Sequence, residues 1–184
     1  SIGAHLISNA EWMALARDIE SVSDNYVSGV LKRGNVGDTA TGDYNGADPE
    51  AGVTNALATL YLSNGQAIHH FSGNVWEWVD YTIAGAGSQP KDNDDTTWAW
   101  NEFSAIDTWG NVLGYENVGP KNPSLDGSTG AGRIYSANDA TYATVRALRR
   151  GGSWSSTSYA GVFALSTDLG PTAAYTDIGF RCAR

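Results

Sequence analysis

The sequence contains a single cysteine, and its apolar runs are all short. One cysteine cannot form an internal disulfide, so the protein either works in a reducing compartment or folds outside the cell without disulfides. A membrane-spanning helix needs about eighteen or more consecutive apolar residues, and no run approaches that length. The sequence therefore predicts a domain that has no internal disulfide and does not insert into a membrane.

Basic residues are scarce as well. The chain has 11 Lys and Arg residues against 20 Asp and Glu residues, which gives a formal net charge of −9. Nucleic acids and anionic membranes are bound through basic surfaces that displace counterions. The charge balance therefore excludes nucleic acid from the expected partners.

The length and composition predict one domain over residues 1–184. A chain of 184 residues that is 41% hydrophobic is long enough for one core and not obviously for two. Its 22 glycines, 7 tryptophans and 9 tyrosines are typical of loops held by large aromatic side chains, which favours a loop-rich α+β fold. The chain starts without an initiator methionine or a signal-like segment, so we expect a monomeric domain of a longer chain.

The clearest helix signal covers residues 9–22. Ser8 and Glu11 have the spacing of a capping box, in which each side chain bonds a free amide at the helix start. Apolar residues then recur at helical spacing, namely Trp12, Leu15, Ala16, Ile19 and Val22. This pattern predicts an amphipathic helix with Trp12 in the core.

A hairpin is predicted for residues 59–71. Leu60 and Leu62 alternate with other side chains, and Asn64-Gly65 is typical of a primed turn with two positive φ angles. The segments 25–50 and 110–141 are rich in Gly, Asn, Asp and Thr or Ser, which predicts irregular loops on the surface. A short helix after Asp48 is a further expectation, because Pro49 suits the first helical position.

Two tryptophan pairs stand at strand spacing. In an extended segment 73–78, Trp76 and Trp78 share one side as a buried pair, and Glu77 points to the other. Trp98 and Trp100 repeat this spacing further along the chain. Core packing is the favoured interpretation for that second pair, and one or two exposed rings lining a ligand surface is the alternative. The run Asp92 to Asp95 between the pairs is interpreted as a solvated loop.

The last part of the chain has apolar, glycine-rich ends around a polar middle. Arg150-Gly151-Gly152-Ser153-Trp154 and Ile178-Gly179-Phe180-Arg181 form the ends, and the large side chains Trp154, Ile178 and Phe180 are expected to be buried. A strand is predicted for residues 145–150, and residues 162–165 are expected to form another, buried strand. We call residues 150–181 the C-terminal segment.

Nine residues of the C-terminal segment show neither helical nor strand periodicity, so their side chains are expected to point outward from loops. They are Ser155, Ser156, Tyr159, Ser166, Asp168, Leu169, Ala173, Tyr175 and Asp177. Loops on a rigid scaffold are where binding residues concentrate. We therefore predict that these nine residues form a ligand-binding surface.

Three motifs in order resemble one known family. Gly73-Asn74-Val75-Trp76-Glu77-Trp78, the RGGSW sequence at 150–154 and the IGFR sequence at 178–181 are similar to the formylglycine-generating enzyme, or sulfatase-modifying factor, type of C-type lectin fold. The oxidases of that family carry two cysteines after RGGSW and use copper. Ser156 and Gly161 stand at those places here, so the resemblance implies a relative that is not an enzyme.

The variable proteins of diversity-generating retroelements, a second branch on this fold, resemble the chain more closely. In that branch the segment from RGGSW to IGFR is rewritten at template adenines, mostly in Asn codons, and forms a binding surface. The nine residues above are all reachable from such codons. The resemblance implies a protein or cell-surface partner, and a virion or cell surface as the location.

Charged residues near the motifs have two interpretations each. The resemblance implies a weak calcium candidate at Glu77, but His70 takes the place of an Asn ligand, so a buried carboxylate that holds loops is favoured and no cofactor is expected. For Arg149, Arg150 and Arg181 we favour ion pairs with Glu77 or nearby aspartates over recognition of an anionic ligand. A carbohydrate-binding lectin domain, or a catalytically inactive relative of the oxidases, is the alternative function.

Overall fold

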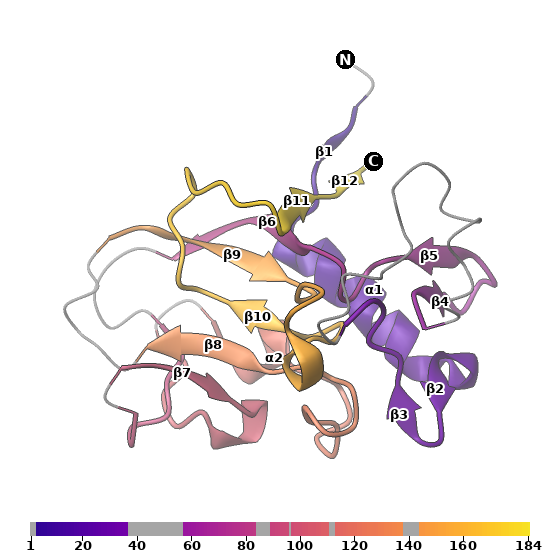
Figure 1. Ribbon diagram of the computed structural model, residues 1–184, viewed down its shortest axis with the longest axis horizontal. Coiled ribbons are helices and arrows are strands. Elements are labelled where there is room, and N and C mark those ends of the chain that lie inside the picture. Colours follow the sequence, from indigo (N-terminus) through magenta and orange to yellow (C-terminus); the bar gives the residue numbers. More distant parts are fainter. Residues whose placement is uncertain (1–2, 37–56, 84–88, 96, 111–112, 138–143) are drawn as a thin grey trace.

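A sheet of six strands organises the molecule, seen in a computed structural model that describes residues 3–36, 57–83, 89–95, 97–110, 113–137 and 144–184 (Figure 1). The strand order is β11-β6-β9-β10-β8-β7. The strands are β6 (Trp76–Ile83), β7 (Trp98–Asn101), β8 (Ile134–Ala137), β9 (Arg146–Arg150), β10 (Leu165–Ser166) and β11 (Ile178–Phe180). The fold is α+β, mostly sheet with few helices, as predicted.

Helix α1 spans Asn9–Ser21, so the predicted helix is confirmed. The Ser8 hydroxyl accepts the Glu11 N–H, and the Glu11 carboxylate accepts the Ser8 N–H, which completes the capping box. The buried side of α1 carries Trp12, which is 0% exposed and stacks on Phe71 with 3.9 Å between ring centroids. No helix in the described part of the chain is long and apolar enough to cross a bilayer.

One face of the sheet forms the core together with α1. Val79, Leu148, Leu165 and Ile134, from four adjacent strands, are all nearly inaccessible to solvent. Apolar side chains from α1 and from other segments outside the six-stranded sheet pack with them, including Trp12, Ile19, Leu31, Phe71, Phe103 and Phe163. The side chains on the other face of the sheet are therefore not part of this core.

Three small antiparallel pairs flank the sheet. They are β1 (His5–Leu6) with β12 (Cys182–Ala183), β2 (Tyr26–Val27) with β3 (Val30–Leu31), and β4 (Thr59–Tyr61) with β5 (Ala67–His69). The pairing of β1 with β12 brings the two ends of the chain together at one side of the molecule (Figure 1). Short helices occur at Ser23–Asn25 (η1), Phe103–Ala105 (η2), Tyr115–Val118 (α2) and Thr157–Tyr159 (η3).

The hairpin β4–β5 is confirmed, but its turn is not a primed turn. Within it Gly65 has a positive φ of 84°, whereas Asn64 is absent from the residues with positive φ. The Gly65 N–H donates to the Leu62 carbonyl, and the Leu62 N–H donates to the Gln66 carbonyl. This is a turn followed by one left-handed glycine, so the loop is longer than the two residues predicted.

Three other predictions are wrong in part. The expected loop 25–50 contains η1, β2 and β3 in its described portion, and the helix expected after Asp48 lies outside the described residues. The expected loop 110–141 contributes β8 to the middle of the sheet. Val162 and Phe163 are buried as expected, but strand β10 includes only Leu165–Ser166.

Candidate ligand-binding face

A row of side chains crosses the sheet on the face opposite the core. Residues that are paired across adjacent strands lie on the same face of a sheet. The pairings connect all six strands in the order Phe180, Trp78, Arg149, Ser166, Tyr135 and Trp100. Trp76 and Trp98 lie two residues before Trp78 and Trp100, so they point to the same side. We call this set of eight residues the outer face.

The aromatic rings of the outer face stack on one another around Trp100. Its ring centroid lies 4.9 Å from that of Tyr135 and 6.1 Å from that of Trp76. Tyr159, from the C-terminal segment, stacks on Trp100 at 4.7 Å with an interplanar angle of 5°. All these rings except Trp76 are half-buried, so their edges remain accessible to a ligand.

Arg149 is the cation of the outer face. Its guanidinium carbon lies 5.2 Å from the Trp76 ring centroid and 5.8 Å from that of Trp78. The Nη2 group donates to the Ser166 hydroxyl at 3.0 Å and forms an ion pair with Asp168. The expected pairing of Arg149 with an aspartate is therefore confirmed.

Backbone hydrogen bonds join the C-terminal segment to the sheet at several points. At the start of β6, the Trp154 N–H donates to the Asn74 carbonyl at 2.9 Å, and the Trp76 N–H donates to the Asp177 carbonyl at 2.8 Å. Further along β9, the Ala147 N–H donates to the Leu169 carbonyl at 2.9 Å. The segment therefore follows the sheet from one end to the other, as its path in Figure 1 shows.

The nine predicted residues fall into three groups. Ser155 and Tyr175 are exposed, with Tyr175 at 60%. Five residues are half-buried, namely Tyr159, Asp168, Leu169, Ala173 and Asp177. Ser156 and Ser166 are buried, at 7% and 1% exposure, so the prediction of accessible side chains is wrong for both, although Ser166 lies on the outer face.

Hydrogen bonds explain why these two serine hydroxyls are covered. The Ser156 hydroxyl accepts the backbone N–H of Ser153 at 2.9 Å and so closes the turn after the RGGSW motif. The Ser166 hydroxyl accepts from Arg149 and donates to Asp168. Short hydroxyl side chains often bond nearby backbone in this way, and sequence periodicity does not show it.

The prediction that Trp154, Ile178 and Phe180 are buried is also wrong. Phe180 is 69% exposed, and the other two are half-buried. The reason is that β11 is an edge strand, where Phe180 pairs with Trp78 on the outer face. Phe180 instead lines a shallow groove of about 410 Å³ together with Trp78, Thr82, Ala147 and Pro171.

Glu77 lies on the core side of β6, and Arg181 binds both of its carboxylate oxygens. The Arg181 Nη2 and Nε groups donate to Oε1 at 2.7 Å and to Oε2 at 3.0 Å. Burial raises the pKa of the Glu77 carboxyl above its ordinary value, and the charge of Arg181 opposes that rise. The residues around Glu77 do not fit a calcium ion, because a cation already occupies both oxygens.

Arg150 departs from the expected ion pairing. It is 0% exposed, and its partners are the Asn9 side-chain oxygen and the carbonyls of Val118 and Phe163. Burial and, to a smaller extent, the charge of Arg17 lower the pKa of this guanidinium to about 9. Arg150 is thus a buried cation held by neutral oxygens, which connects α1, α2 and the C-terminal segment.

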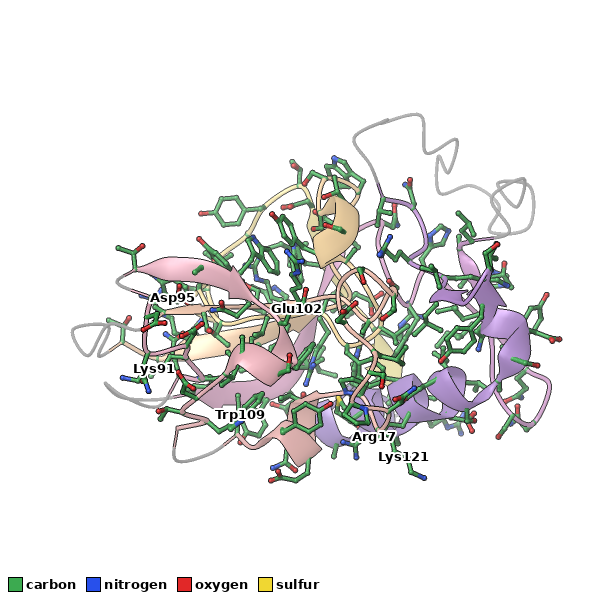
Figure 2. All side chains as sticks on the ribbon, turned by 90° about the horizontal axis from the view of Figure 1, so that it is seen from below. Arg17, Lys91, Asp95, Glu102, Trp109 and Lys121 are labelled. Carbon is green, nitrogen blue, oxygen red and sulfur yellow. The ribbon has the colours of Figure 1, made fainter. Side chains whose placement is uncertain are left out.

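The acidic run at residues 92–95 forms a turn at one end of the molecule. The Asp94 N–H donates to the Asp92 carboxylate at 3.0 Å, and the Asn101 amide donates to the Asp95 carboxylate. Figure 2 shows Lys91 and Asp95 at this end, away from Arg17 and Lys121 beside α1. Among the described residues no group of three or more His, Cys, Asp or Glu side chains is arranged to hold a metal ion.

A comparison with protein families gives one match, the sulfatase-modifying factor enzyme 1-like domain, over residues 1–184. The chain belongs to this family. A search of curated proteins found no match. The resemblance seen in the three sequence motifs is therefore confirmed at the level of the family.

In this sulfatase-modifying factor domain, Ser156 and Gly161, the positions that the sequence resemblance matches to the oxidase cysteines, are both buried. Ser156 is buried and bonded to backbone, as described above. A Cβ atom at Gly161 would lie 2.3 Å from the backbone of Ala131, so that position has no room for any side chain. The only cysteine, Cys182, is exposed on β12.

Sequence reasoning missed most of the outer face of this family member. Tyr135 lies in a segment predicted to be loop; of the predicted buried pair, Trp76 is buried and Trp78 is only half-buried. The alternation of Trp98 and Trp100 was the available signal, since rings at that spacing must share one face. The interpretation that one or two of these rings line a ligand surface fits their half-buried state.

Proposed function

We propose that this domain is a ligand-binding protein and that its ligand contacts the outer face and the accessible residues of the C-terminal segment. The observation that carries this proposal is the row of outer-face residues across all six strands, placed opposite the core. Accessible side chains on that face can change without opening the core, because Val79, Leu148 and Leu165 fill the other face.

The composition of the face suits a protein or cell-surface partner. Trp, Tyr and Arg dominate the residues that contribute most to protein–protein binding. Accessible Tyr and Ser side chains, here Tyr175 and Ser155, add rigid contact area and adaptable hydrogen bonding, as in antibody loops. We place the domain on a C-type lectin fold at the surface of a virion or cell.

We further propose that the C-terminal segment is diversified by a retroelement. Such a mechanism needs positions that tolerate many side chains beside positions that hold the backbone. Exposed Ser155 and Tyr175 and half-buried Ala173 and Asp177 suit the first requirement, and buried Arg150 suits the second. The closed positions Ser156 and Gly161 support binding over thiol chemistry.

Sequencing the DNA around the coding region tests this proposal. We expect a near-copy of the codons for residues 150–181 close by, differing from them at adenines, together with a reverse transcriptase gene. The adenines should coincide with the codons of the accessible residues named above. A locus without such a copy would overturn diversification and leave only an invariant binding domain.

A further inference from the structure

The guanidinium of Arg149 is shielded from solvent, yet it belongs to the face where a ligand would bind. Arg149 is 6% exposed, and the Trp76 and Trp78 rings line it at 5.2 Å and 5.8 Å. An arginine between aromatic rings is held in one orientation, and its planar group suits bidentate binding of a carboxylate. The guanidinium is therefore preorganised to bind a carboxylate.

The hydrogen-bonding capacity of this guanidinium is not fully used. The Nη2 group donates to Ser166 and to Asp168, whereas the Nε–H is buried and has no acceptor among the described residues. A guanidinium offers five N–H donors, and a buried donor without an acceptor is costly. Arg149 can therefore bind a further oxygen if one reaches it.

Asp168 stands between Arg149 and solvent. Its side chain is 26% exposed and that of Arg149 is 8% exposed, so the aspartate occupies the accessible side of the pair. Asp168 comes from the C-terminal segment, whereas Arg149 belongs to strand β9. A carboxylate from a ligand would meet the negative charge of Asp168 before it reached the guanidinium, and like charges repel.

We propose that Arg149 is a carboxylate-binding residue of the outer face and that the side chain at position 168 determines whether a ligand can use it. This inference rests on the proposed function, because it concerns the ligand of the same face. With Asp168 present, the face excludes an acidic side chain of a protein partner at this point. With a small neutral residue there, the partner's carboxylate takes the place of the aspartate.

The test uses sodium acetate as the probe and the Asp168→Ala variant of the full chain. The Arg149 Nε–H signal is followed by ¹H–¹⁵N NMR while acetate replaces chloride at constant ionic strength. The signal is assigned by its loss in Asp168→Ala/Arg149→Lys. We expect a saturable shift in Asp168→Ala, with acetate bound about tenfold more tightly than in wild type, the scale of one charge-assisted hydrogen bond.

Asp177→Ala is the matched control. It removes one carboxylate from the same segment at another half-buried position, and Arg149 pairs with Asp168 instead. We expect this variant to bind acetate as weakly as wild type. An equal affinity in the two variants, or no saturable shift in Asp168→Ala, would overturn the inference.

A second variant, Asp168→Ser, is used if Asp168→Ala does not fold. If Asp168→Ala does not fold in chloride, Asp168→Ser is titrated in the same way. If both variants are unfolded, acetate is added to each of them. Refolding in acetate supports the proposal, and a protein that stays unfolded overturns it. Neither result depends on the retroelement. If the locus has no template copy but acetate binding is saturable, diversification is rejected and the carboxylate site is kept. If the locus has a template copy but acetate does not bind, the carboxylate site is rejected and diversification is kept.

Discussion

Replacing Trp12 with alanine is expected to lower the free energy of unfolding by about 3–5 kcal/mol, the range for large buried aromatic side chains. Trp12 is 0% exposed, stacks on Phe71 and donates its Nε1–H to the Val162 carbonyl at 2.8 Å. A Cβ atom at Gly151 would stand 3.5 Å from its ring, so the tryptophan also supports the turn of the RGGSW motif. Urea unfolding followed by circular dichroism measures the loss.

The variant Trp12→Phe separates packing from hydrogen bonding. Phenylalanine keeps an aromatic ring against Phe71 and leaves the buried Val162 carbonyl without its donor. We expect an intermediate loss of about 1–3 kcal/mol, the cost of a buried group left unsatisfied plus some lost packing. A loss below about 1 kcal/mol for Trp12→Ala would show that α1 does not anchor the C-terminal segment.

Replacing Gly152 with alanine is the second large change. Gly152 has a φ of +85°, and an added Cβ would lie 2.6 Å from the Ala160 Cβ and 2.7 Å from the Ala160 Cα. The backbone around residues 152–160 must therefore move. We expect a loss of about 2–5 kcal/mol, the sum of about 1–2 for a left-handed alanine and about 1–3 for overpacking.

Gly65→Ala is its matched control in the same unfolding measurement. Gly65 has nearly the same φ, +84°, and an added Cβ would meet nothing within 4 Å. This variant has the conformational cost alone, about 1–2 kcal/mol. Equal losses in the two variants would show that close contact with Ala160 does not hold the turn in place.

The parts of the fold that were predictable depend on signals between neighbouring residues. The capping box at Ser8 and Glu11 and the apolar spacing after it lie within one helix, so sequence alone located α1. The hairpin β4–β5 was predictable for the same reason. Its turn was not, because Asn64-Gly65 suits more than one loop length.

The outer face depends on contacts that sequence does not specify locally. Trp78 is far along the chain from Tyr135 and Arg149, and the three residues share a face only through the register of the sheet. Periodicity also could not show that Phe180 is exposed, because burial of an edge-strand side chain depends on what covers it. The burial of Ser156 and Ser166 was not predictable, because it depends on their hydrogen bonds and not on their hydropathy.

Arg150 shows a limit of charge-based reasoning. In an acidic chain a basic residue is expected to pair with a carboxylate, and Arg149 and Arg181 do so. Arg150 instead binds one amide oxygen and two backbone carbonyls, which only the folded chain brings together. A buried cation can be satisfied by neutral oxygens, and such a set has no sequence pattern.

The most direct test of the account compares thermal stability after two sets of asparagine replacements. One variant changes exposed Ser155 and Tyr175 and half-buried Ala173 and Asp177, and the other changes the buried Ser156 and Ser166. We expect the first Tm to stay within about 3 °C of wild type and the second to fall by about 10 °C, since each buried change costs about 1–3 kcal/mol. Equal losses in the two variants would contradict the separation between a fixed scaffold and an exchangeable binding surface.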